Sequence, residues 1–268
     1  MIENGNAVCL FRFTEKQWAD RFIDGEISFS CPGKFIYQNK ITGNEEQGDK
    51  LEAVFAKLKK DDERIQIAKE TLGRDLEIIV DDETEGEYVY LRRRSAKLKP
   101  IFCIYACTAG DLLEDNIANI EKTGWQLLPH TFDDKMYGGF SQTYQFNNVM
   151  NEKKRFTQLL IDAKAFIDRI RYGLFFESKA YKMEKLNYDE FKKETFYIEP
   201  TNEYLELFYK RPEYRYQHEA RIVLIADKFN TINDRYNLKV VPFKLNENVN
   251  MSHVPTVIKL EVDIELAN

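Results

Sequence analysis

Short apolar, β-prone runs separated by polar segments dominate the hydrophobic pattern of this chain. The first run, Ala7–Phe13, predicts a strand, and Glu26–Ser30 returns to strand alternation after a helix that ends near Asp24. That helix opens with TEKQ, Thr14–Gln17, which is typical of a capping box, and Gly25 ends it. The pattern therefore predicts a strand–helix–strand unit at the start of the chain.

The next segment, from Cys31 to about Gly48, is polar and rich in glycine, which predicts a long loop. From Asp49 the apolar spacing predicts a helix through Leu58, followed by a second helical piece that ends near Gly73. The sequence DDETEG is a strong hairpin signal between two of the later strands. Strands are expected at residues 76–80, 88–91, 100–107, 140–146, 156–161, 174–183, 214–225, 238–243 and 256–262, and helices at 111–121, 162–172, 186–194 and 203–210.

Helices inserted among strands in this irregular order favour an α+β fold over a regular parallel α/β wheel. We expect a single mixed domain over residues 1–268, with a central, largely antiparallel β core and peripheral helices. The core could form one sheet or two small packed sheets. No internal repeat or low-complexity linker divides the chain.

Composition narrows the class of protein without naming a function. The 268 residues are 43% hydrophobic and 31% charged, with a net charge of −6, so no global basic field indicates nucleic-acid binding. No apolar run reaches the ~18 residues of a membrane helix, and the start MIENGNAV lacks the features of a secretory signal. The four cysteines are too few to staple a secreted domain of this size. We therefore expect a soluble, cytoplasmic protein.

Common catalytic motifs do not occur. The sequence contains no G-x₄-G-K-[ST] or G-x-G-x-x-G phosphate-binding pattern, and it contains no G-x-S-x-G nucleophile elbow. His218-Glu219 begins H-E-x-x, but Ile222 occupies the position of the second histidine, which excludes a zincin site. We therefore predict no metal site from the histidines.

The candidate chemistry lies in YRYQHEARIVLI, Tyr214–Ile225, where polar residues open an apolar strand. In strand geometry Gln217 and Glu219 share a face, about 7 Å apart. A carboxylate near an oxocarbenium-like sugar carbon lowers its energy, most effectively in a dry cleft, while a neighbouring amide orients an acceptor. These two residues are the predicted catalytic pair.

A Gln-x-Glu sequence on a strand resembles the dyad of the mono-ADP-ribosyltransferases. The resemblance implies that Glu219 stabilises the ribosyl cation of NAD and that Gln217 helps to select a protein or nucleic-acid acceptor. It implies an NAD-binding role for Arg12 on the first strand, in LFRF. It also implies that Ser28, Ser30 or Ser141 braces the site and that the 31–48 loop covers it.

A second resemblance covers more of the chain. The layout is similar to a large bacterial and phage family known only as a domain of unknown function. It rests on LFRF, on EISFSCP, and on FYKRPEYRYQHEARIVL, Phe208–Leu224. The family's Asn-Asp-Pro-hydrophobic-Glu segment is missing, and only Gly48-Asp49 and Glu52 lie near its place, so the match is partial. This resemblance implies no activity, and its setting suggests a toxin, phage or anti-phage role.

Two other functions compete with the transferase. The first is a non-catalytic binding or regulatory protein with a structural Glu219/Arg221 strand. The second is a metal-dependent nuclease that uses Asp162 and Lys164, although Asp162 is also a good N-cap for the helix that follows. The transferase hypothesis requires Arg12 and Glu219 to face one cleft, so the fold itself tests it.

Overall fold

The computed structural model describes residues 7–42, 49–81, 84–108, 155–188, 204–244 and 257–263. Within them the chain is an α+β protein with three antiparallel sheets, which confirms the predicted fold class. The predicted helix at 111–121, the predicted strand at 140–146 and Ser141 lie outside the described residues.

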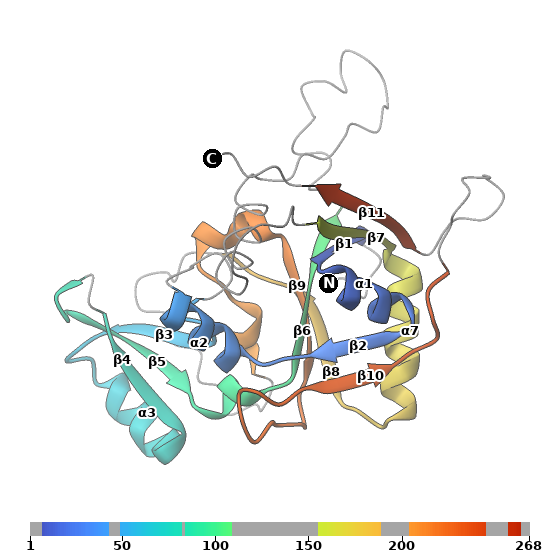
Figure 1. Cartoon of the computed structure of the whole chain (residues 1–268). Helices are drawn as coiled ribbons and strands as arrows, with labels where there is room; N and C mark the ends of the chain where they lie inside the picture. Colours follow the sequence, from blue (N-terminus) through green and yellow to red (C-terminus); the bar gives the residue numbers. More distant parts are fainter. Residues whose placement is uncertain are drawn as a thin grey trace, which may run out of the picture.

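The central sheet has six strands in the order β11-β7-β1-β6-β9-β8, and every neighbouring pair is antiparallel. It crosses the middle of the molecule in Figure 1. Its strands are β1 (Ala7–Thr14), β6 (Ile101–Thr108), β7 (Arg155–Asp162), β8 (Tyr181–Lys185), β9 (Glu219–Leu224) and β11 (Val257–Asp263).

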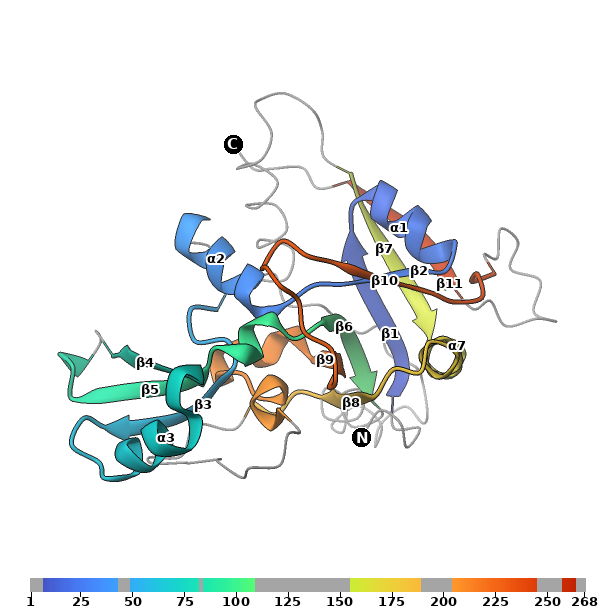
Figure 2. The same cartoon turned by 90° about the horizontal axis from the view of Figure 1, so that it is seen from below.

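One face of the central sheet carries the main hydrophobic core. Helices α1 (Lys16–Ile23) and α7 (Ala163–Phe176) pack there, together with the two-stranded sheet of β2 (Glu26–Phe29) and β10 (Tyr236–Lys239). Figures 1 and 2 show these four elements gathered on the same side of β1. The core is built around stacked aromatic rings, those of Phe22, Phe102, Phe166 and Phe243.

A three-stranded sheet with its own apolar core projects from one side of the molecule (Figures 1 and 2). Its order is β3-β5-β4, and helix α3 packs against it. The elements are β3 (Val54–Lys59), α3 (Arg64–Leu72), β4 (Leu76–Val80) and β5 (Tyr88–Arg93). The predicted β4–β5 hairpin is confirmed, because the two strands pair antiparallel across the acidic turn.

Two element predictions between residues 31 and 59 are wrong. The predicted loop contains helix α2 (Pro32–Thr42), which begins with a proline, a residue well suited to the first turn of a helix. The predicted helix from Asp49 is instead a turn followed by β3, in which Val54, Phe55 and Leu58 are buried. Their spacing fits either period, and pairing with β5 decides for the strand.

The ends of two helices also differ from the prediction. Glu15, not Thr14, precedes α1, and no side chain caps it, so the predicted capping box is not formed. Helix α7 continues beyond Gly173 to Phe176. A Cβ at Gly173 would lie 3.0 Å from Val240 Cγ1, so Gly173 allows close packing inside the helix and does not end it. No helix in the described part of the chain is long and apolar enough to cross a membrane.

Gly25 ends α1 as predicted and tests the packing of this region. Its φ is +83°, its carbonyl accepts the Val240 N–H at 2.8 Å, and an added Cβ would lie 2.2 Å from the Val240 carbonyl oxygen. We expect Gly25→Ala to lower the free energy of unfolding by about 2 kcal/mol or more, since strained φ and backbone overlap add together. Chemical denaturation measures the change. The matched control is Gly73→Ala, which also has positive φ (+52°) but no neighbour within 4 Å and should cost clearly less.

Candidate functional site

The candidate segment folds as a tight turn followed by a strand. Residues Pro212–Gln217 form a 3₁₀ helix, His218 adopts a left-handed conformation with φ of 39°, and β9 begins only at Glu219. The His218 carbonyl accepts the Ala106 N–H at 2.9 Å, which fixes the turn against β6. The prediction that Gln217 and Glu219 share a strand face is therefore wrong, because Gln217 precedes the strand.

Glu219 is nonetheless bonded to Gln217 through a lysine. Lys210 Nζ donates to Gln217 Oε1 at 2.6 Å and to Glu219 Oε2 at 3.0 Å. The other oxygen of Glu219 accepts from Arg221 Nε at 2.6 Å, and the Glu219 N–H donates to the Tyr188 hydroxyl at 2.7 Å. Gln217 and Glu219 thus lie close together, but both carboxylate oxygens and the backbone N–H of Glu219 already have protein partners.

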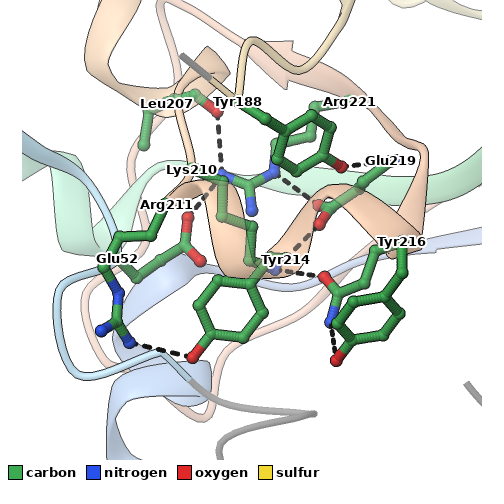
Figure 3. Close-up of polar contacts among 10 residues, drawn as sticks. Glu52, Tyr188, Leu207, Lys210, Arg211, Tyr214, Tyr216, Glu219 and Arg221 are labelled. Atoms are coloured by element: carbon green, nitrogen blue, oxygen red, sulfur yellow. Dashed lines mark hydrogen bonds and ion pairs between the residues drawn. The ribbon is translucent and has the colours of Figure 1, made fainter. Parts of the chain in front are cut away.

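Arg221 is the most deeply enclosed charge of the group, with only 1% of its surface exposed. Its Nη1 donates to the Leu207 carbonyl at 2.8 Å and to Glu52 Oε1, while its Nε bonds Glu219. Figure 3 shows the guanidinium of Arg221 between Glu52 and Glu219, with Lys210 beside them. Glu52 lies in the turn before β3, so this contact joins the three-stranded sheet to the central sheet.

A second ion pair continues the network toward the surface. Arg211 Nη2 donates to Asp49 Oδ1 at 2.9 Å and to the Tyr214 hydroxyl at 3.0 Å, and Arg211 Nη1 pairs with the exposed Glu213 at 2.7 Å. We call the six inner charges the ion cluster: Asp49, Glu52, Lys210, Arg211, Glu219 and Arg221. Three carboxylates face three cations, so the cluster is neutral as a whole.

The electrostatics keep the central groups in their ordinary charge states at neutral pH. Burial alone would raise the pKa of Glu219, but the charges of Arg221 and Lys210 outweigh it, and its pKa lies well below the usual range. Burial alone would lower the pKa of Lys210, but the charges of Glu219 and Glu52 raise it by more, so the pKa is raised overall. Desolvation and the charge of Glu219 raise the pKa of the Cys103 thiol.

These shifts bear on the chemistry that the ion cluster can perform. A general acid or base works best with a pKa near the operating pH, and a cysteine nucleophile needs a lowered pKa. The pKa of Glu219 is lowered, and the pKa values of Lys210 and Cys103 are raised, so all three move away from these requirements. The arrangement is suited to holding fixed charges in a buried place and to tying chain segments together.

Arg12 lies on the opposite face of the central sheet from Glu219. The strand register pairs Phe11 with Tyr105 and Tyr105 with Glu219, which sets these three side chains on one face. Arg12 points to the other face, where its guanidinium lies 4.7 Å from the Phe102 ring centroid and donates to the Cys103 carbonyl at 3.2 Å. The predicted cleft between Arg12 and Glu219 is therefore not formed.

Two of the serines predicted to brace the site, Ser28 and Ser30, are also remote from Glu219. Ser28 lies in β2 opposite Asn237 of β10, and Ser30 forms a bridge with Ile101. Strand β2 packs on the same face as Arg12, where burial lowers the pKa of that guanidinium to about 10. Arg12, Ser28 and Ser30 thus belong to the side of the main hydrophobic core.

The residues of the nuclease hypothesis have structural partners. Asp162 accepts the Ala165 N–H and caps α7, as the N-cap interpretation predicts. Lys164 forms an exposed pair with Asp168 one turn later in the helix. Among the described residues, no group of three or more histidine, cysteine, aspartate or glutamate side chains could hold a metal ion.

Sequence reasoning did not assign roles to most of the ion cluster. Glu52 and Lys210 lie 169 and 11 residues before Arg221 in the chain, and only the fold brings them together. A partial signal existed in the segment Phe208–Leu224, which supplies Lys210, Arg211, Glu219 and Arg221 and which is one of the stretches on which the resemblance to the bacterial and phage family rests.

The fold and site together define an α+β protein whose two larger sheets meet at a buried ion cluster. No family model, curated protein or solved structure matches the chain.

The Glu52–Arg221 pair should be a major source of stability. Removing one partner of a buried ion pair leaves an uncompensated charge, so we expect Arg221→Met and Glu52→Gln each to cost about 3–5 kcal/mol. The double variant should cost clearly less than the sum of the two, as measured by denaturant unfolding of all four proteins. Arg215→Met, at an exposed arginine of the same segment, is the control. Additive effects within about 0.5 kcal/mol would contradict this coupling.

The lowered pKa of Glu219 predicts a pH signature. A carboxylate whose pKa is depressed in the folded state contributes stability above its unfolded pKa, and loses it as pH falls toward the folded value. The stability gap between the wild type and Glu219→Gln should therefore be full at pH 7 and shrink below the ordinary value of 4.5. Thermal unfolding between pH 7 and pH 3 measures the gap. Glu213→Gln, at an exposed carboxylate, should show a much smaller gap; an equal gap would refute the assignment to Glu219.

Proposed function

We propose that the protein is a binding or regulatory protein, and that Glu219 is a structural charge in it rather than the catalytic carboxylate of an ADP-ribosyltransferase. The observation that carries this proposal is the engagement of both Glu219 oxygens, one by Arg221 at 2.6 Å and one by Lys210 at 3.0 Å. A carboxylate stabilises a ribosyl cation only when its field is directed at the reacting carbon. Two cations already neutralise the field of Glu219.

The separation of the predicted anchor residues supports the same proposal. An NAD molecule bridging Arg12 and Glu219 would have to pass through the central sheet, because the two side chains leave opposite faces. A serine brace from Ser28 or Ser30 meets the same obstacle, since β2 packs on the Arg12 face.

The resemblance to the bacterial and phage family suits a binding role. The segment Phe208–Leu224 contributes Lys210, Arg211, Glu219 and Arg221 to the ion cluster. Asp49 and Glu52, which lie near the place of the family's missing Asn-Asp-Pro-hydrophobic-Glu segment, contribute the other two charges. We propose that this cluster is the shared structural core of that layout. A regulatory protein in a phage or bacterial defence setting is the function that this core would support.

The proposal predicts a particular pattern for variants of the Lys210–Glu219 pair. Replacing both buried charges costs less than leaving one of them alone, so Lys210→Met/Glu219→Gln should be more stable than Glu219→Gln or Lys210→Met. Hydrogen exchange should show strong protection of β9 amides in the wild type, loss in the single variants and recovery in the double variant.

An assay of nicotinamide release from NAD separates this proposal from a catalytic role. NAD labelled in the nicotinamide ring should yield no more free nicotinamide with the wild type than with heat-inactivated protein. Turnover that disappears in Glu219→Gln and stays absent in the more stable double variant would overturn the proposal, because restored stability would then not restore activity.

A further inference from the structure

Strand β4 is the outer strand of the three-stranded sheet within the described part of the chain. The register fixes which of its backbone groups face outward. Asp81 N–H donates to the Tyr88 carbonyl at 3.0 Å and Arg94 N–H to the Asp75 carbonyl at 2.6 Å, so odd-numbered residues bond β5. Ile78 and Val80 therefore direct their N–H and C=O groups away from the sheet.

The side chains of these two residues are also exposed. Ile78 and Val80 are 40% and 53% exposed, although they lie on the face of the sheet that packs against α3. Across the ladder they oppose Leu91 and Val89, both buried in that core. The apolar layer between the sheet and α3 thus continues to the outer edge, where no further strand of the described residues covers it.

Natural edge strands are usually protected by lysine, proline, a bulge or a covering element. Between Leu76 and Val80 the sequence LEIIV has no lysine or proline, and its one charged residue, Glu77, is bonded to Arg92. An edge with outward backbone groups and β-branched side chains is the type of surface that receives an added strand from a partner.

The charge beside this edge indicates which partner strand fits. The turn that follows β4 carries Glu85 and Glu87, both exposed, and neither forms an ion pair with another described residue. The turn lies at the Val80 end of β4, so a strand added along β4 would have one end on the side of this acidic turn, where basic residues would be favoured and acidic ones repelled.

We infer that the β4 edge is a strand-addition site for an extended segment of a partner protein, with β-branched residues alternating along it and lysine or arginine at one end. The added strand would bond the backbone of Ile78 and Val80 and place its own side chains beside theirs. This inference goes beyond the proposed function, because it concerns a different surface and does not depend on the role of the ion cluster.

The probe for the test is a fluorescein-labelled peptide, Lys-Thr-Lys-Val-Thr-Ile-Thr-Val-Gly, titrated with the full chain and followed by fluorescence anisotropy. We expect saturable binding to the wild type. Ile78→Pro should weaken it at least tenfold, because proline removes an outward N–H while leaving the bonds to β5 intact. Val80→Lys should have a similar effect by repelling the basic strand. The matched control is Ile67→Lys, which changes an apolar residue of α3 with 51% exposure and should bind as the wild type does.

Two altered peptides separate strand addition from simple apolar or ionic adhesion. N-methylation of alternate amides should abolish binding, because it removes the donors and keeps the side chains. Replacing the lysines by glutamates should weaken binding several-fold, and Glu85→Gln/Glu87→Gln should reduce that difference. The inference is overturned if the N-methylated peptide binds equally well, if no peptide binds at millimolar concentration, or if sedimentation shows that a second copy of the chain occupies the edge.

Discussion

The burial of Arg221 is the constraint on which the arrangement of the sheets depends. A guanidinium that is 1% exposed cannot be hydrated, so its charge must be met by protein groups placed around it. Those groups come from three separate places: Glu219 two residues earlier on β9, the Leu207 carbonyl, and Glu52 before β3. The contacts that balance the charge of Arg221 therefore bring together the central sheet, the short 3₁₀ helix Leu205–Phe208 and the three-stranded sheet. The neighbouring Arg211–Asp49 pair repeats this connection nearer the surface.

The same alternation that builds the central sheet separates the residues of the transferase hypothesis. Along β1 and β9, neighbouring side chains leave opposite faces, so Phe11 shares a face with Glu219 whereas Arg12 shares one with Phe102. One face is apolar and holds Arg12 by stacking on aromatic rings. The other face holds the ion cluster. A shift of one residue in β9 would bring Glu219 to the face of Arg12, but it would also bury Glu219 in the aromatic core, which the hydrophobic pattern forbids.

Local signals predicted much of the fold, whereas the long-range contacts of the site had no local signal. The β1–α1–β2 unit, the β4–β5 hairpin and the Asp162 cap each follow from residues close together in the chain. The predictions at 31–59 were wrong because the apolar residues there fit two periods, and β3 forms only by pairing with β5. Gln217 and Glu219 were singled out from their residue types, but the turn at His218 and the bridge through Lys210 depend on the tertiary structure. No local spacing could indicate that Glu52 would meet Arg221.

The three-stranded sheet has an apolar core of its own, and charged contacts join it to the central sheet. Its core lies between α3 and β3–β5–β4, whereas Glu52–Arg221, Asp49–Arg211 and Arg93–Glu206 lie at the junction. Buried pairs are screened only weakly by salt, whereas exposed carboxylates such as Glu85 are screened within a Debye length of about 8 Å at physiological ionic strength. Added salt should therefore weaken electrostatic attraction at the acidic turn of the three-stranded sheet more than it weakens the buried ion pairs at the junction. In high salt, a strand added at β4 would keep its backbone hydrogen bonds and lose only the attraction of the acidic turn. The ion pairs that join the three-stranded sheet to the central sheet would stay formed.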